Sequence, residues 1–174
     1  MVKTLLEWKI ADPNCQDVYG LSPLVNAITN GHEGVVKSLL EREDVDPNLP
    51  DGDGDIPLGY AAIMGNEGLV KLLLERGDVD PNRRGDCGRT PLANAASNGH
   101  EGVVKLLLER EDVDPYRRDN FLLTPLSIAT STWNGHERIV QLLQARKSVE
   151  TPGAGASRER KRDVLMRLAL SVLE

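Results

Sequence analysis

The sequence predicts an all-α fold, a solenoid of stacked helix-turn-helix units with projecting β-turn loops. An Asp-Pro-Asn motif returns every 34 residues and is altered only in its fourth copy, at residues 12–14, 46–48, 80–82 and 114–116. A Pro-Leu motif keeps the same step, at residues 23–24, 57–58, 91–92 and 125–126. A third marker is a turn glycine, found at Gly31, Gly65, Gly99 and Gly135. Repeats of this length indicate stacked units, because one unit alone cannot bury its own apolar face.

The third unit shows why a first helix is expected. Thr90 is a good helix cap, and Pro91 suits the first helical position, where the backbone amide has no partner within the helix. A short helix is therefore predicted from Pro91 to about Ser97, and Gly99 supplies the left-handed conformation that closes it. In the second unit Ile56 takes the place of the cap, so that helix should start less firmly.

A second helix is predicted after the glycine turn. Glu101 stands near its positive end, where a carboxylate is favourable. Residues 82–89 are rich in Gly, Asp and Arg, which favours an extended turn between units. The stripe expected to be buried follows helical spacing, at Val103, Val104, Leu107 and Leu108.

These motifs together resemble the ankyrin repeat over residues 1 to about 150. The resemblance rests on the Thr-Pro-Leu start, the Ala95-Ala96 pair, the Asn-Gly-His turn and the Val-Val-Lys-Leu-Leu-Leu-Glu helix, which keep register through four copies. The chain departs from the family at the position that usually carries His after Thr-Pro-Leu, which is occupied here by Val25, Gly59, Ala93 and Ser127. The resemblance implies that loops and first helices line one concave face, where family members generally bind proteins.

The repeat register also divides the chain. The chain opens on the second helix of a unit whose first helix is missing. Met1 therefore begins either a truncated piece of a longer array or an N-terminal lid. The fourth unit has two extra residues between Pro125 and Gly135, and residues 149–152 take the place of the turn at 113–116. The expected parts are the second helix of an incomplete repeat over 1–12, repeats over 13–46, 47–80, 81–114 and 115–150, a flexible joint over 151–157 and a capping helix over 158–174.

Composition excludes several classes of protein. Apolar residues make up 40% and charged residues 28%, which is typical of a folded protein, and the net charge of −6 argues against a broad nucleic-acid surface. Cys15 and Cys87 lie far apart with no C-x-x-C pair, so no disulfide or zinc framework is expected. The chain has no signal-peptide core and no apolar run of the roughly 20 residues that span a bilayer. We expect an intracellular monomer, cytoplasmic rather than nuclear.

Candidate catalytic and metal-binding residues have simpler interpretations. Residues 51–55 imitate the start of a calcium loop, but Ile56 stands where glycine is needed and Ala62 where a bidentate glutamate is needed. An acidic loop tip is therefore expected. The histidines share one position of the repeat, which indicates turn residues because a catalytic histidine would occur once, at His32, His100 and His136. No enzyme activity, cofactor or metal is expected.

Residues that break the repeat are the candidates for binding another protein. They vary in character while the second helices barely change, and the scarce aromatic residues fall among them. Phe121 and Trp133 have an alternative role, folding inward to cover the insertion. The candidate partner-binding residues are Tyr19, Leu21, Asp53, Asp55, Ile63, Met64, Arg89, Ser97, Asn98, Phe121, Leu123 and Trp133.

Charge along this face changes sign, from aspartates in the second loop to arginines in the third and fourth, which would orient a partner with matching charges. The sequence therefore predicts a protein-protein interaction module: an adaptor, scaffold or inhibitor. Two alternatives stay open, a regulatory ankyrin fragment of a larger enzyme or receptor, and a hydrolase or metal-dependent enzyme. The basic run at 158–162 is interpreted as the solvated end of a helix, with a targeting or calmodulin-binding segment as its alternative.

Overall fold

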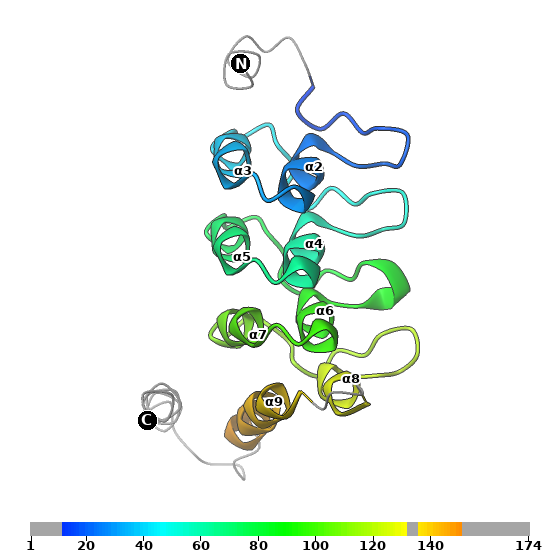
Figure 1. Ribbon diagram of the computed structural model, residues 1–174, viewed down its shortest axis with the longest axis vertical. Coiled ribbons are helices and arrows are strands. Elements are labelled where there is room, and N and C mark those ends of the chain that lie inside the picture. Colours follow the sequence, from blue (N-terminus) through cyan, green and yellow to red (C-terminus); the bar gives the residue numbers. More distant parts are fainter. Residues whose placement is uncertain (1–11, 132–135, 151–174) are drawn as a thin grey trace.

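Four helix pairs stacked along one axis form the described part of the chain, residues 12–131 and 136–150 of a computed structural model (Figure 1). The first helices are α2 (Pro23–Thr29), α4 (Pro57–Met64), α6 (Pro91–Asn98) and α8 (Pro125–Ser131). The second helices are α3 (Glu33–Leu40), α5 (Glu67–Leu74), α7 (Glu101–Leu108) and α9 (Glu137–Glu150). The described residues contain no strand, and the predicted all-α repeat fold is confirmed. The joint over 151–157, the capping helix over 158–174 and all of the leading half-repeat except Asp12 lie outside them.

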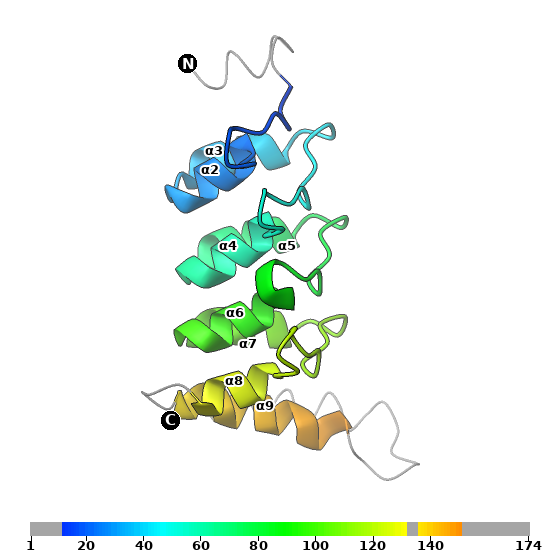
Figure 2. The ribbon, with the colours of Figure 1, turned by 90° about the vertical axis from the view of Figure 1, so that its right-hand side faces the viewer.

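Each pair presents the same two sides. The first helices lie between the second helices and the loops, and all loops project on one side of the stack (Figures 1 and 2). We number these loops in chain order as the first (residues 15–21), second (49–55), third (83–89) and fourth (117–123). The third loop contains a short 3₁₀ turn, η1 (Asp86–Gly88). The loops and the first helices therefore share one side, which is the side predicted to bind a partner, and we call it the docking face.

The helix boundaries follow from the predicted caps. The side-chain oxygens of Ser22 and Thr90 accept the amides of Val25 and Ala93 at 3.3 and 3.2 Å, and Thr124 caps α8 in the same way. Ile56 makes no such bond, as expected. Gly99 closes α6 with a φ of 78°, in the left-handed region that glycine adopts without steric cost.

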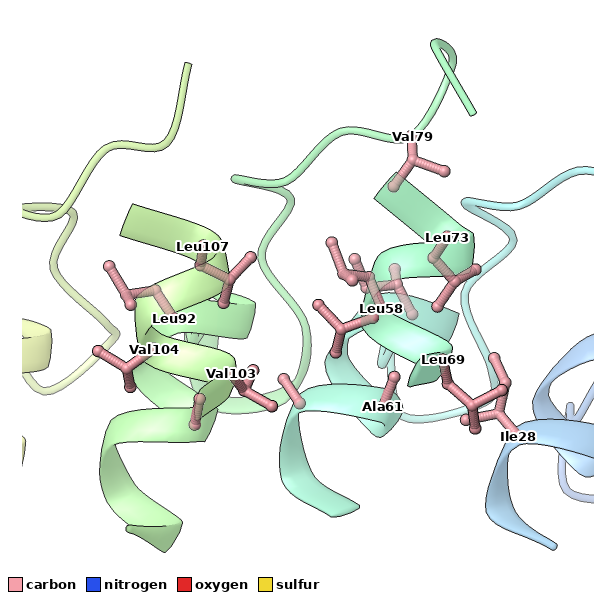
Figure 3. Packing of buried hydrophobic residues seen from close by; sticks show 14 of the residues in the cluster. Ile28, Leu58, Ala61, Leu69, Leu73, Val79, Leu92, Val103, Val104 and Leu107 are labelled. Atoms are coloured by element: carbon pink, nitrogen blue, oxygen red, sulfur yellow. The ribbon is translucent and has the colours of Figure 1, made fainter. Parts of the chain in front are cut away.

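The core runs through the whole stack rather than forming inside each unit. Leu107 of α7 has no exposed surface, and Val103 and Val104 are equally buried. Figure 3 shows Ile28 of α2 meeting Leu69 of α5, so residues from neighbouring units fill one continuous apolar layer. Small buried residues at one register position, Ala27, Ala61, Ala95 and Ala129, allow the first helices to approach closely.

An asparagine ladder joins the bases of consecutive loops. Each amide side chain bridges to the next unit, where it donates to one carbonyl and accepts one backbone amide. Asn82 Nδ2 donates to Asp112 O at 2.5 Å, and Asp114 N donates to Asn82 Oδ1 at 2.7 Å. Asn48 and Asn14 make the corresponding bonds one and two units earlier, respectively. These bonds explain the recurrence of Asp-Pro-Asn, and the ladder ends where Tyr116 replaces asparagine.

An arginine ladder joins the ends of the second helices. The last carbonyls of a helix have no partner within it, and a cation is favourable at that negative end. In each case an arginine of the following unit donates to these carbonyls. The bonds run from Arg76 Nη1 to Leu40 O at 3.0 Å, from Arg110 Nη1 to Leu74 O at 3.2 Å and from Arg146 Nη1 to Leu108 O at 3.2 Å.

Two of the three repeated histidines, His100 and His136, form a third ladder. His100 Nε2 lies 2.8 Å from the carbonyl oxygen of Ile63, in the last turn of the preceding first helix, and His136 Nε2 lies 3.4 Å from Ser97 O. A Cβ added at Gly65 would collide with the His100 ring. In the second unit Asn66 takes the histidine's place and instead caps α5, accepting Leu69 N at 3.0 Å. These histidines therefore tie units together, a role that the turn interpretation had missed.

The last second helix is longer than its counterparts. α9 has 14 residues, whereas α3, α5 and α7 each have 8. It includes residues 149 and 150, so their expected place in the turn between units is corrected. The earlier second helices end before an Arg-x-Asp ion pair, which is followed by an Asp-Pro step. In the fourth unit Ser148 replaces the aspartate of the ion pair, and Thr151 replaces the proline. Without proline or the aspartate, the helix continues.

We expect Asn82→Ala to lower the free energy of unfolding by about 1 to 2 kcal/mol, because it removes two inter-unit bonds and leaves Asp114 N without its partner. Asn98→Ala is the matched control, since the Asn98 side chain bonds only within α6, to Asn94 O. Urea denaturation of both variants measures the difference. Equal losses would show that the inter-unit bridge contributes nothing specific.

Candidate functional site

Each loop of the docking face is closed by a backbone hydrogen bond across its tip. The amides of Asp17, Asp51, Gly85 and Asp119 donate to the carbonyls four residues later, at 3.1, 2.9, 2.9 and 2.9 Å. In three loops the aspartate carboxylate also accepts two amides. Asp119 Oδ1 accepts Phe121 N and Leu123 N, both at 2.9 Å. The fourth loop is therefore a fixed platform, although it has no regular secondary structure.

The same carboxylate arrangement recurs in the first two loops. Asp17 Oδ1 accepts Tyr19 N and Leu21 N, and the bond from Leu21 is the main reason why the pKa of Asp17 lies below its ordinary value. Asp51 Oδ1 accepts the amides of Asp53 and Asp55, and its other oxygen accepts the hydroxyl of Tyr60. The carboxylate of Asp51 thus closes its own loop. Sequence reasoning missed this role, although the 34-residue recurrence of aspartate was its signal.

Neighbouring loops are joined at their tips. Gly52 N donates to Tyr19 O at 3.3 Å, and Asn120 N donates to Cys87 O at 2.9 Å. The second and third loops meet through Asp55, whose Oδ1 accepts Asp86 N at 3.0 Å. The tips therefore form one connected edge rather than four independent loops.

A buried ion pair links the third and fourth loops. The Asp119 side chain has no exposed surface, and its Oδ2 lies 3.7 Å from Arg89 Nε. Neither atom has a hydrogen-bond partner among the described residues. Arg89, which was predicted to contact a partner, lies against Asp119 with 34% of its side chain exposed. The ion pair with Asp119 therefore helps to fix the fourth loop, whose tip residues are exposed.

The tip of the fourth loop is apolar and exposed. Phe121 is 65% exposed and Leu123 38%, and both were predicted on this face. Leu122, which was not predicted, is 71% exposed and has a φ of 63°. The other loops carry glycine at this position, Gly20, Gly54 and Gly88, all with positive φ. A leucine in place of that glycine was the sequence signal for the site.

The remaining predicted residues are spread along the same face. Tyr19 is 76% exposed in the first loop, and Met64 is 51% exposed at the end of α4. Asp53 and Asn98 are exposed, whereas Leu21, Asp55, Ile63 and Ser97 are partly buried. Trp133 lies outside the described residues. Phe121 and Leu123 thus share one loop, whereas Tyr19 and Asp53 lie nearer the N-terminal end.

Comparison with protein families agrees with this architecture. Residues 1–85 match the family model for ankyrin repeats in three copies, and residues 73–129 match the model for ankyrin repeats in many copies. The chain belongs to the ankyrin repeat family. Ankyrin repeats are generally protein-protein interaction modules and form a non-catalytic fold. A comparison with curated proteins finds no matching relative.

Among the described helices of the ankyrin stack, none has the length and apolar character needed to cross a membrane. The part of the chain that the structure describes also holds no group of three or more His, Cys, Asp or Glu side chains suited to a metal ion.

Asp119→Ala should lower the free energy of unfolding by roughly 2 to 4 kcal/mol, because it leaves Arg89 Nε and two loop amides without their partner. Hydrogen exchange at Phe121 and Leu123 should accelerate at the same time. Asp17→Ala is the control, since the exposed Asp17 makes the same pair of amide bonds without an ion pair, and its effect should be smaller. Equal effects would mean that the Arg89 contact is dispensable.

Asp55→Asn should raise the melting temperature at pH 7. Burial, aided by the charges of Asp51, Asp86 and Asp53, raises the pKa of Asp55 above its ordinary value, so the ionised form opposes folding at neutral pH. That penalty disappears as the pH falls below about 3.9, where the carboxyl is protonated in both states. The melting temperatures of variant and parent should therefore converge in acid. Asp53→Asn, at an exposed neighbour, controls for removal of charge alone.

Proposed function

We propose that this chain is a protein-binding module, an adaptor, scaffold or inhibitor, whose partner docks on the face formed by its loops and first helices. The observation that carries the proposal is the distribution of exposed apolar side chains. The exposed large hydrophobic residues of the described chain lie in the loops, at a loop base or at the end of a first helix, and none lies on a second helix. They are Val18, Tyr19, Met64, Tyr116, Phe121, Leu122 and Leu123.

Leu122 strengthens the proposal because its backbone conformation lowers the folding stability of the protein. A leucine in the left-handed region is unfavourable by roughly 1 to 2 kcal/mol, and at 71% exposure its side chain recovers little through burial. Glycine occupies the corresponding position in every other loop, so the fold itself does not require leucine. Contact with a partner accounts for an apolar side chain held in solvent at this cost.

The loop also has the rigidity that an interface anchor needs. Phe121 and Leu123 are held through their amides by the buried Asp119, and Asn120 is tied to the third loop through Cys87 O. A preorganised loop loses little conformational entropy on binding, so more of the contact energy appears as affinity. Aromatic and aliphatic anchors at the centre of such a site typically contribute about 2 kcal/mol or more.

Leu122→Gly separates binding from folding. We expect the variant to be as stable as the parent or up to about 1 kcal/mol more stable, because the left-handed strain is relieved. We also expect it to lose partners, and Phe121→Ala should speed their dissociation about tenfold or more. Affinity capture from cell extract followed by mass spectrometry compares these variants with the parent.

Lys71→Ala, on the exposed side of α5, is the control for this capture. A partner that recognises the docking face is retained by Lys71→Ala and lost from both loop variants. If Phe121→Ala and Leu122→Gly retain every protein that the parent captures, while Lys71→Ala does not, the docking face has been assigned to the wrong side of the stack.

A further inference from the structure

The arginines of the described chain fall into two groups. Those at 42, 76, 89, 110, 138 and 146 bind carboxylates or backbone carbonyls of the protein itself. The second group is Arg83, Arg84, Arg117 and Arg118, all of them exposed, and none forms an ion pair with a described residue. Of these four, Arg84 alone donates to a backbone carbonyl, Gly88 O of its own loop at 2.8 Å. The whole chain carries a net charge of −6, so this basic group is opposite in sign to the net charge of the protein.

The four arginines are gathered by the contacts between two loops. At the loop bases Asp114 N donates to Asn82 Oδ1, and at the tips Asn120 N donates to Cys87 O. Residues 83–86 and 117–120 therefore run side by side between these points, as the neighbouring green and yellow loops of Figure 1 show. Arg84 itself reaches across, with Nη2 2.9 Å from Asn120 Oδ1. The basic group thus lies beside the apolar tip of the fourth loop.

Arg84 bonds to Gly88 and Asn120, whereas Arg83, Arg117 and Arg118 have no such contact with a described residue. Like charges on adjacent segments repel one another, and no carboxylate of a described residue forms an ion pair with these arginines. Guanidinium groups are suited to carboxylates, which they can bind through two parallel hydrogen bonds. The basic group and the apolar tip are adjacent, so one ligand segment can contact both.

We propose that the docking face binds an acidic protein segment that also carries apolar side chains. Its carboxylates lie against Arg83, Arg117 and Arg118, and its apolar residues cover Phe121 and Leu122. This inference rests on the proposed binding function and adds the chemistry of the partner. The second loop, with Asp53 exposed and Asp51 and Asp55 partly so, limits the basic surface on the N-terminal side and sets the direction in which the segment lies.

The same features disfavour a nucleic acid as the ligand. A phosphate backbone continuing along the face would pass from the arginines to the aspartates of the second loop and to Asp86, where it is repelled. The exposed Leu122 side chain offers no hydrogen bond to phosphate or base edges. An acidic peptide can place its few carboxylates on the arginines alone.

Selection from a random-peptide display library against the full chain tests the inference. We expect the selected peptides to be enriched in Asp and Glu together with Phe and Leu. Binding of these synthetic peptides should weaken about tenfold or more at low salt in the double variant Arg117→Glu/Arg118→Glu, and the difference should shrink as salt is added. The control is Lys37→Glu/Lys71→Glu, which makes the same change in net charge at exposed positions of α3 and α5 and should leave binding unchanged.

The other outcomes separate this inference from the proposed function. Selected peptides that are basic or uncharged, yet lose binding with Phe121→Ala, would refute the acidic partner and leave the docking face intact. Peptides that bind Phe121→Ala as tightly as the parent would refute both proposals. A single-stranded oligonucleotide that binds more tightly than the acidic peptides, and is lost with Arg117→Glu/Arg118→Glu, would replace the peptide by a nucleic acid.

Discussion

Every helix end in this stack leaves backbone carbonyls or amides without a partner, and side chains from a neighbouring unit satisfy many of them. Arg76 and Arg110 donate to the last carbonyls of the preceding second helices, His100 lies against the end of α4, and Asn48 and Asn82 bridge the loop bases. A polar group left unsatisfied costs more than the net gain from a typical hydrogen bond. The units therefore depend on one another for hydrogen bonds to their backbone groups as well as for the burial of their apolar side chains.

The proposed binding surface also depends on these contacts between units. Because the loop bases are fixed by the asparagine ladder and the tips by bonds between loops, the exposed residues stand on a connected edge. The buried pair of Arg89 and Asp119 carries the connection into the fourth loop, where the apolar residues are concentrated. A surface built in this way can hold Phe121 and Leu122 in solvent without the loop collapsing onto the stack.

The features that suggest function are those in which one unit departs from the others. Leu122 stands where the other loops carry glycine. In the third loop Arg89 pairs with Asp119 and Arg84 bonds to Gly88 and Asn120. Arg83, Arg117 and Arg118 contribute to no contact of this kind among the described residues. Residues that maintain the ladders recur in most units, since the units have the same helix ends to satisfy. A departure that lowers stability and exposes apolar or charged groups has no purpose in the stack itself, which is why it points to a partner.

The sequence by itself determined the repeat, the helix pairs, their caps and the buried stripe, because these depend on local spacing and on residues close in the chain such as Thr90, Gly99 and Val103. It also indicated the face on which Phe121 and Leu123 stand. Only the tertiary structure showed that Arg89 faces a buried Asp119, that the histidines reach the preceding unit and that α9 continues to Glu150. The two side-chain contacts join residues about 30 to 40 positions apart, so they depend on how closely the units stack, which local spacing does not express.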